Sequence, residues 1–310
     1  MPEHRLPTKE EALLYFRERN NWGRWGPDDQ RGAINLITAE KRVRAAGLVR
    51  SGRSVSLSRD FPKTPGRGNP QPAQHFVRMY DDAVVDYYGI SYHGYVTTHV
   101  DALCHVWDQG GMTKSVRDLS WRWNGRDPKA EITSEGARFG GIENWRDGIT
   151  TRGVLLDVPR FRGEPHVTLE TPVHGWELEA ICEAQGVAVE PGDALVVYSG
   201  RESWQAANPS WSGYSPPSPG LHVSCMPFVR DHDVSALCWD LMDAVPNEYG
   251  LRWSMHGALV AYGVALVDNA LLQPLAEACA EENRWEFMFT LAPLPVIGGT
   301  GSPVNPLALF

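Results

Sequence analysis

One stretch of eight residues places two imidazoles and a carboxylate close together in the chain: Thr98-His99-Val100-Asp101-Ala102-Leu103-Cys104-His105. Residues 92–100 are rich in aromatic and β-branched side chains, which predicts a strand. On a strand, His99 and Asp101 point to the same face, about 6.5 Å apart along the chain. His105 follows in a short loop or helical turn over the same place. Imidazole and carboxylate groups are preferred ligands of divalent ions, so the stretch predicts a metal or reactive site.

The same stretch resembles the signature His-x-Gly-Thr-His-x-Asp-x-Pro-x-His of the putative cyclase family. That family of metal-dependent hydrolases includes bacterial kynurenine formamidases and isatin hydrolases. Residues 25–38, 191–200 and 287–306 resemble further parts of the family, so the resemblance covers nearly the whole chain. It implies an α/β fold in which a barrel-like mixed β core is wrapped by helices.

The chain departs from the signature at its first histidine, where Tyr95 stands. A phenolate ligand is costly because the reference pKa of tyrosine is near 10. His93 is the nearest substitute, but a straight strand would hold it roughly 20 Å from His99. Gly94 offers a bend that would shorten that distance. Otherwise His93 is a packed or hydrogen-bonded residue of the strand.

The resemblance implies roles for the candidate residues. His99 and Asp101 would bind a divalent ion, with Mn²⁺ or Zn²⁺ expected, and His93 is a further candidate ligand. His256 and Asp268 resemble a late metal-proximal pair in which the acidic residue is usually Glu. The shorter carboxylate of Asp268 leaves open whether one or two ions bind.

Catalytic and substrate-binding roles are assigned to four other side chains. His105 is the candidate general base or proton shuttle, because the pKa of histidine lies near working pH. Tyr95 is a second candidate acid or base, or a group that orients substrate. Trp107 is a candidate substrate contact in a chain with 12 Trp, which favours a flat aromatic substrate. His222 either faces the pocket or caps the following helix.

Three functions follow from these residues. The first is metal-dependent hydrolysis of an amide-like or lactone bond in a small aromatic or cyclic compound, by an enzyme acting on C–N bonds other than peptide bonds. The second is a metal-independent cyclase or dehydratase on the same fold. The third is a small-molecule binding protein without catalysis.

Composition narrows the range of partners. The net charge of −9 argues against nucleic-acid binding, which needs a basic face. No apolar run approaches the roughly 20 residues of a membrane helix, and the first residues lack a secretory signal. The five cysteines form no CxxC pair and predict reduced, buried thiols. We therefore expect a cytoplasmic protein with a small-molecule substrate, and the resemblance implies a homodimer or homotetramer.

The order of elements predicts a single domain over residues 1–310. Residues 9–20 predict an N-terminal helical extension, and residues 74–80 and 83–88 predict paired strands. Residues 201–219 predict a long loop of the kind that often serves as a lid. Residues 285–292 predict the final strand. The tail 307–310 either serves an interface or packs on its own domain.

Overall fold

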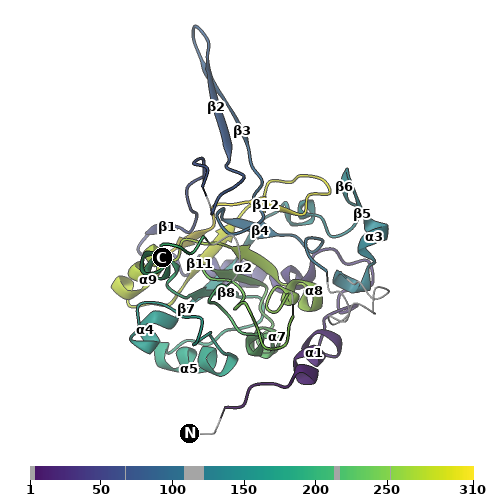
Figure 1. The fold of residues 1–310 in the computed structure, drawn as a ribbon, viewed down its shortest axis with the longest axis vertical. Coiled ribbons are helices and arrows are strands. Elements are labelled where there is room, and N and C mark those ends of the chain that lie inside the picture. Colours follow the sequence, from purple (N-terminus) through teal and green to yellow (C-terminus); the bar gives the residue numbers. More distant parts are fainter. Residues whose placement is uncertain (1–3, 67, 108–121, 213–216, 252) are drawn as a thin grey trace.

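The computed structural model of the chain describes residues 4–66, 68–107, 122–212, 217–251 and 253–310. In these residues one curled nine-stranded sheet forms half of a barrel, and helices flank it (Figure 1). The expected α/β fold with a barrel-like mixed β core wrapped by helices is confirmed. No helix among the described residues is long and apolar enough to span a bilayer.

The strands are β1 Ser54–Ser56, β2 Gln74–Met79, β3 Val84–Gly89, β4 His99–Asp101, β5 Ile132–Thr133, β6 Gly136–Ala137, β7 Ile149–Asp157, β8 Ala194–Tyr198, β9 Ala236–Trp239, β10 Ala265–Asp268, β11 Glu286–Leu291, β12 Gly301–Pro303 and β13 Leu307–Leu309. The α-helices are α1 Lys9–Arg17, α2 Ala39–Ala46, α3 Pro128–Glu131, α4 Val158–Arg162, α5 Gly175–Gln185, α6 Arg201–Ala207, α7 Met226–Asp231, α8 Gly257–Tyr262 and α9 Gln273–Glu282. Short 3₁₀ helices are η1 Gly32–Leu36, η2 Trp123–Gly125, η3 Ile142–Trp145 and η4 Val223–Cys225.

The centre of the sheet consists of four parallel strands, β7, β8, β9 and β10, paired side by side in that order. Every residue of β8, β9 and β10 is buried. Strands covered on both faces read as continuous apolar runs, and Ala194-Leu195-Val196-Val197 is such a run. Because the four strands are parallel, their carboxyl ends lie at the same end of the sheet.

Strand β4 lies next to β10 in the sheet and runs antiparallel to it. It pairs antiparallel with β10 on one side and with β12 on the other. The register places His99 opposite Asp268, and Asp101 opposite Leu266. The pairing thus brings a motif near residue 100 against the carboxyl end of a strand near residue 268.

The N-terminal helix occurs where residues 9–20 predict it. Thr8 caps α1 in a capping box with Glu11, in which each side chain bonds the other residue's backbone N–H. The following segment is fixed to the body, because Asn21 donates hydrogen bonds to the carbonyls of Ala261 and Tyr262.

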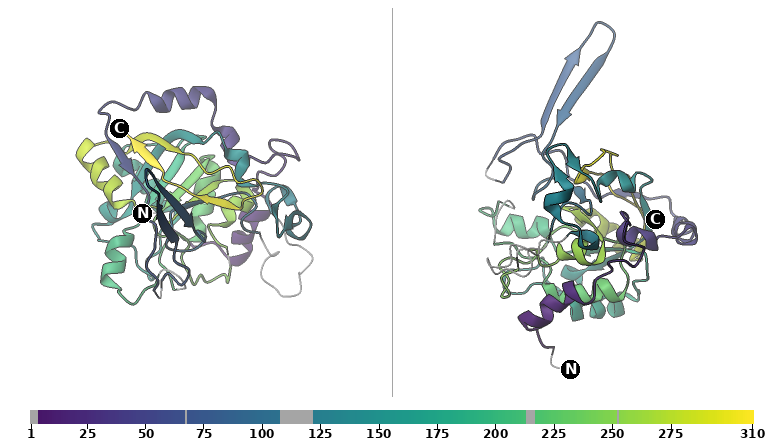
Figure 2. Two further views of the ribbon diagram at one scale, coloured as in Figure 1. Left: turned by 90° about the horizontal axis from the view of Figure 1, so that it is seen from above. Right: turned by 90° about the vertical axis from the view of Figure 1, so that its right-hand side faces the viewer.

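Strands β2 and β3 form a two-stranded hairpin that projects away from the rest of the molecule (Figures 1 and 2). The two strands lie where the sequence predicts them. We call residues 74–89 the arm.

Three sequence expectations are corrected by the structure. Of the expected strand 92–100 only residues 99 and 100 lie in a strand, β4, because the chain bends before them. The expected loop 201–219 begins with helix α6, whose residues Trp204-Gln205-Ala206-Ala207 tolerate a helix well. Residues 285–292 do not hold the final strand, because β12 and β13 follow. The tail 307–310 packs on its own chain. Strand β13 lies in the nine-stranded sheet between β1 and β11, and Phe310 is buried against Phe287.

Candidate metal centre

The carboxylate of Asp101 lies at the centre of a cluster of histidines. Its oxygens lie 3.0 Å from His93 Nδ1, 3.3 Å from His99 Nε2, 3.6 Å from His105 Nε2 and 4.0 Å from His256 Nε2. Asp101 is 0% exposed and His99 is 1% exposed. Burial alone would raise the pKa of Asp101, but His105, His93 and His99 together hold that pKa well below its usual value.

His99 is oriented by the residue two positions before it. Its Nδ1 lies 2.8 Å from the carbonyl oxygen of Thr97. Because a carbonyl only accepts, Nδ1 carries a proton and donates it. In the neutral ring, Nε2 then carries the lone pair and faces Asp101 at 3.3 Å and Asp268 at 3.9 Å. Burial disfavours a charged His99, but Asp101, Asp268 and the carbonyl of Thr97 together outweigh burial and raise the pKa of His99.

His93 reaches the cluster because the chain bends between it and β4. Its ring lies 5.1 Å from the ring of His99, far closer than a straight strand would allow. His93 Nε2 is hydrogen-bonded to Thr300 Oγ1 at 2.9 Å, which turns Nδ1 toward Asp101. A β-carbon on Gly301 would lie 2.9 Å from His93 Cε1, so the glycine leaves room for the ring. Of the two alternatives that the sequence leaves open, the structure has the bend at Gly94, where φ is 132°, and not the straight strand.

The bend itself is held through its backbone carbonyls. The side-chain amide of Asn269 donates to the carbonyls of Gly94 and Thr97, and Arg201 donates to the carbonyl of Tyr95. Arg201 also donates to Asn269 Oδ1 at 2.6 Å, which joins the two side chains into one clamp. We call Asn269 and Arg201 the clamp.

His256 is held between two carboxylates. Its Nδ1 is hydrogen-bonded to Asp243, and its Nε2 lies 3.1 Å from Asp268 Oδ2. Trp239 Nε1 donates to the other oxygen of Asp268 at 2.6 Å. Burial would lower the pKa of His256, but the charges of Asp243 and Asp268 raise it well above its usual value.

His105 lies over the cluster from the turn after β4. Its ring stacks on that of His93 with centroids 3.7 Å apart and an angle of 6° between the planes. Burial is the main reason that the pKa of His105 falls to about 4, and the neighbouring histidines lower it further. His105 is therefore neutral near pH 7 and offers a lone pair.

The donor set fits a divalent ion. Two groups of three have their ligand atoms within 4.8 Å of one another: His93, Asp101 and His105, and His99, Asp101 and Asp268. Donors about 2.1 Å from a tetrahedral ion lie roughly 3.4 Å apart, which matches the shorter distances around Asp101. Despite the short distances, three atoms form no hydrogen bond of acceptable geometry within the described part of the chain: both carboxylate oxygens of Asp101 and Nδ1 of His93. A buried carboxylate without hydrogen bonds is costly, and a cation among these nitrogens would satisfy it.

Tyr95 belongs to neither group of three. It is half-buried, and burial together with Asp243 raises the pKa of its hydroxyl. A protonated phenol is a hydrogen-bond donor near the acidic residues of the cluster and a poor metal ligand.

The two candidate substrate contacts lie apart from one another. Trp107 is partly exposed and lines a hollow of about 170 Å³ with Pro128, Lys129 and Ile132. His222 is buried, accepts from the backbone N–H of Ser224, and lies 3.1 Å from Glu248. The structure therefore places His222 in the helix-capping position, with its side-chain contacts outside the cluster.

Sequence reasoning did not identify the clamp. The Asp268-Asn269 pair at the end of a predicted strand is a weak signal of an ordered turn, and nothing in the sequence marks Arg201.

Asp240 and Asp243, which follow β9, accept hydrogen bonds from backbone N–H groups in this structure. Asp243 thus supports His256 and is not itself a candidate ligand.

Comparison with known proteins agrees with this fold. A family model described as putative cyclase matches residues 53–244, more than half of the chain. The chain belongs to the putative cyclase family. No curated protein matches it significantly.

Solved structures share the architecture. A protein described as a novel cyclase is 29% identical with a TM-score of 0.78, over 94% of this chain and 99% of that protein. An isatin hydrolase bound to the product analogue thioisatinate is 14% identical with a TM-score of 0.53, over 88% and 99% of the two chains. Isatin hydrolase A from Ralstonia solanacearum is 17% identical with a TM-score of 0.52, over 86% and 95%. At these identities the isatin hydrolases show the fold alone.

Proposed function

We propose that this protein is a metal-dependent hydrolase that cleaves an amide-like or lactone bond in a small aromatic or cyclic compound. The observation that carries the proposal is the buried carboxylate of Asp101, which faces the ring nitrogens of four histidines and receives no hydrogen bond from the described part of the chain. The same fold in isatin hydrolases supports the choice of a cyclic amide.

The residues divide into ligands and proton carriers. His93, His99, Asp101 and Asp268 would hold the ion, with His256 beside Asp268. A divalent ion bound there lowers the pKa of water and polarises a carbonyl group. His105 is neutral near pH 7 and would take a proton from the attacking water and return it to the departing nitrogen or oxygen. The hydroxyl of Tyr95 would hydrogen-bond the substrate, and Trp107 would pack against an aromatic ring.

Metal content and turnover test this proposal together. The protein is purified without chelator, analysed for transition metals, and assayed on isatin, N-formylkynurenine and simple lactones. We expect about one bound ion per chain, and turnover that is lost after chelation and restored by Mn²⁺ or Zn²⁺. Protein that binds neither ion after reconstitution, or that turns over none of the substrates when loaded, would contradict the proposal.

The role of His105 has its own test. If His105 carries protons, His105→Ala lowers kcat by about 10²–10⁴-fold while metal content stays at the parent level. Loss of metal together with activity would place His105 among the ligands, as its distance of 3.6 Å from Asp101 allows.

A metal-independent cyclase or dehydratase is the second candidate. The specific observation in its favour is the pair of carboxylates, Asp243 and Asp268, that contact the two ring nitrogens of His256. They stabilise the protonated imidazolium, which would serve as a general acid. This function predicts full activity in protein stripped of metal, so the chelation experiment separates the two candidates.

A further inference from the structure

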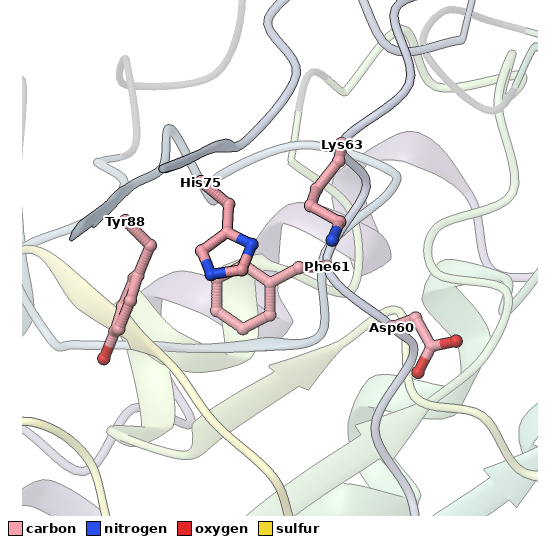
Figure 3. A pocket seen from close by; sticks show the side chains of 5 residues that line it. All are labelled: Asp60, Phe61, Lys63, His75 and Tyr88. Atoms are coloured by element: carbon pink, nitrogen blue, oxygen red, sulfur yellow. The ribbon is translucent and has the colours of Figure 1, made fainter. Parts of the chain in front are cut away.

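The base of the arm and the loop of residues 60–63 border a cavity of about 510 Å³. Among the described residues, the side chains that line it are those of Asp60, Phe61, Lys63, His75 and Tyr88 (Figure 3). Ligand cavities in proteins typically measure about 300–1,000 Å³ and combine aromatic walls with a few polar groups. This cavity has that size and that composition, and none of these five residues belongs to the candidate metal centre.

Two aromatic rings form one wall of the cavity. The rings of Phe61 and Tyr88 meet edge to face, with centroids 5.6 Å apart and an angle of 70° between the planes. Phe61 is 43% exposed and Tyr88 is 56% exposed, so both rings keep apolar surface in contact with water. His75 stands opposite Tyr88 in the arm, and the two side chains therefore project from the same face. A flat aromatic ring that packs on this wall would remove its apolar surface from water.

The cavity also holds two opposite charges that do not neutralise one another. The carboxylate of Asp60 lies at the end away from Tyr88, and the ammonium group of Lys63 lies between them (Figure 3). Neither charge forms an ion pair with another described residue. His75, by contrast, has a partner, because its Nε2 lies 2.6 Å from Asp86 Oδ1. A ligand with a carboxylate and an amine would supply the missing partners of Lys63 and Asp60.

The backbone around Lys63 is held by hydrogen bonds within its own loop. The N–H of Lys63 donates to the carbonyl of Phe61 at 2.9 Å. The buried side-chain amide of Asn69 donates to the carbonyls of Pro62 at 2.6 Å and Thr64 at 2.9 Å, one on each side of Lys63. A loop that is ordered in advance lowers the entropy cost of binding a ligand.

The other end of the loop is attached to the body of the molecule through Arg59, the residue before Asp60. Its backbone N–H donates to Thr98 Oγ1 at 3.0 Å, and its guanidinium group donates to the carbonyls of Asn269 and Ala270 at 3.0 and 3.1 Å. The side chains of the cavity are exposed, but the backbone that carries Asp60 and Lys63 is therefore fixed at both ends.

We propose that this cavity is a second binding site, separate from the metal centre, for a small aromatic compound that carries both a carboxylate and an amine. The ring of the ligand packs on Phe61 and Tyr88, its carboxylate accepts hydrogen bonds from Lys63, and its amine donates to Asp60. A doubly charged anion such as phosphate fits poorly, because the carboxylate of Asp60 repels it.

This site does not depend on the proposed hydrolase activity, but the two are chemically related. Addition of water across the C–N bond of a cyclic aromatic amide frees one carboxylate and one amine on the same molecule. The product of such a reaction therefore belongs to the class of ligand that the cavity would bind.

Calorimetric titration with free L-phenylalanine tests the site, because this probe carries a ring, a carboxylate and an amine. We expect one bound molecule per chain with a Kd of about 1 mM or tighter. Phenylpropanoate lacks the amine and phenylethylamine lacks the carboxylate, and each should bind about threefold or more weakly than L-phenylalanine. Absence of saturable binding of L-phenylalanine, or equal affinity for the three probes, overturns the proposal.

Two substitutions at exposed positions should separate the two charged contacts. Lys63→Met keeps the stem of the side chain and should weaken binding of L-phenylalanine and phenylpropanoate, but not of phenylethylamine. Asp60→Asn should weaken binding of L-phenylalanine and phenylethylamine, but not of phenylpropanoate. Lys9→Met, on the exposed surface of α1 far from the arm, is the matched control and should leave all three affinities unchanged (Figure 1). A Lys63→Met protein that binds both carboxylates as tightly as the parent overturns the proposal.

The same titration on Asp101→Asn separates this cavity from the metal centre. L-phenylalanine should bind this variant as tightly as the parent, because Asp101 does not line the cavity. An affinity that falls in Asp101→Asn and is unchanged in Lys63→Met would place the ligand at the metal centre and overturn the proposal. Parent protein that shows the expected pattern of binding but turns over none of the hydrolase substrates would contradict the proposed hydrolase activity alone, so the two failures are distinguishable.

Discussion

At the scale of single residues, the site depends on a carboxylate in an environment that does not solvate it. Asp101 is fully buried, and the groups around it are nitrogens that bind cations. Among the described residues, no backbone N–H donates a hydrogen bond to the carboxylate of Asp101. A divalent ion held by these side chains would explain its position.

Asp101→Asn should abolish metal binding and leave the fold intact, because the amide keeps the shape and loses the charge. A ligand at about 100 times its Kd stabilises a folded protein by about 2.7 kcal/mol. We therefore expect added Mn²⁺ or Zn²⁺ to raise the Tm of the parent but not of this variant, as followed by circular dichroism. Asp147→Asn, at an exposed position, is the control and should retain the shift. A metal-dependent shift of parental size in Asp101→Asn would rule out its role as a ligand.

The first histidine of the family signature is missing from this chain, and His93 and Tyr95 are the two residues near its place. Substitutions of these two residues should affect metal affinity differently. His93 already points a ring nitrogen at Asp101 at 3.0 Å, so His93→Ala should weaken metal affinity, by about tenfold or more. Tyr95→His should change affinity little, because the position is filled. Competition with a fluorescent chelator measures both. A marked gain in affinity for Tyr95→His would show that His93 is not a ligand.

At the scale of elements, the short strand β4 depends on contacts that lie outside it. Only three residues are extended, yet the bend before them must hold His93 within reach of Asp101. The clamp does this through three carbonyls of the bend, from a residue at the end of β10 and a residue at the start of α6. The position of His93 in the site therefore depends on the hydrogen bonds that attach the bend to Asn269 and Arg201.

Asn269→Gly should loosen the bend without straining the backbone, because Asn269 has a φ of 57° and glycine adopts that conformation freely. Loss of its hydrogen bonds should cost about 2–4 kcal/mol of unfolding free energy and should weaken metal binding. Asn283→Gly is the matched control, since Asn283 has a φ of 48° and is exposed. Urea unfolding and chelator competition measure the two effects. Equal metal affinity in the two variants would show that the clamp does not position the site.

The sequence predicts regular elements well and the bend poorly. Helix α1 and the paired strands of the arm lie where local signals in the sequence predict them. The bend at residues 90–98 follows from long-range contacts with Asn269, Arg201 and Thr300. Those contacts override the strand-like composition of residues 92–100. Gly94 signals that a bend is possible, but the local sequence does not decide between the bend and a straight strand.

At the scale of the whole molecule, the N-terminal segment is fastened to the body by charge as well as by backbone contacts. Both terminal guanidinium nitrogens of Arg24 donate hydrogen bonds to the carboxylate of Asp233. The Arg24 hydrogen bond lowers the pKa of Asp233 despite its partial burial. The folded state thus binds this proton less readily than the unfolded state, whose pKa is about 3.9.

Asp233→Asn should lower stability at neutral pH by about 1 kcal/mol, while asparagine keeps the φ of 49° at this position. The contribution of Asp233 is present above about pH 4 and disappears as the pH falls through the lowered folded-state pKa. The difference in unfolding free energy between parent and variant should therefore shrink in acid. A difference that is constant from neutral pH to pH 3 would show that the ion pair contributes nothing.

The strand order carries a consequence for the kinetics of refolding. Strand β4 pairs with β10 and β12, and β1 pairs with β13, so partners lie more than 150 residues apart in sequence. Helices such as α5 close over a few residues and form early, whereas these pairings must wait for long loops to close. Three of the proposed ligands, His99, Asp101 and Asp268, lie on strands of this late kind. During refolding from denaturant, the capacity to capture a metal ion would therefore return after most of the helical signal has been regained.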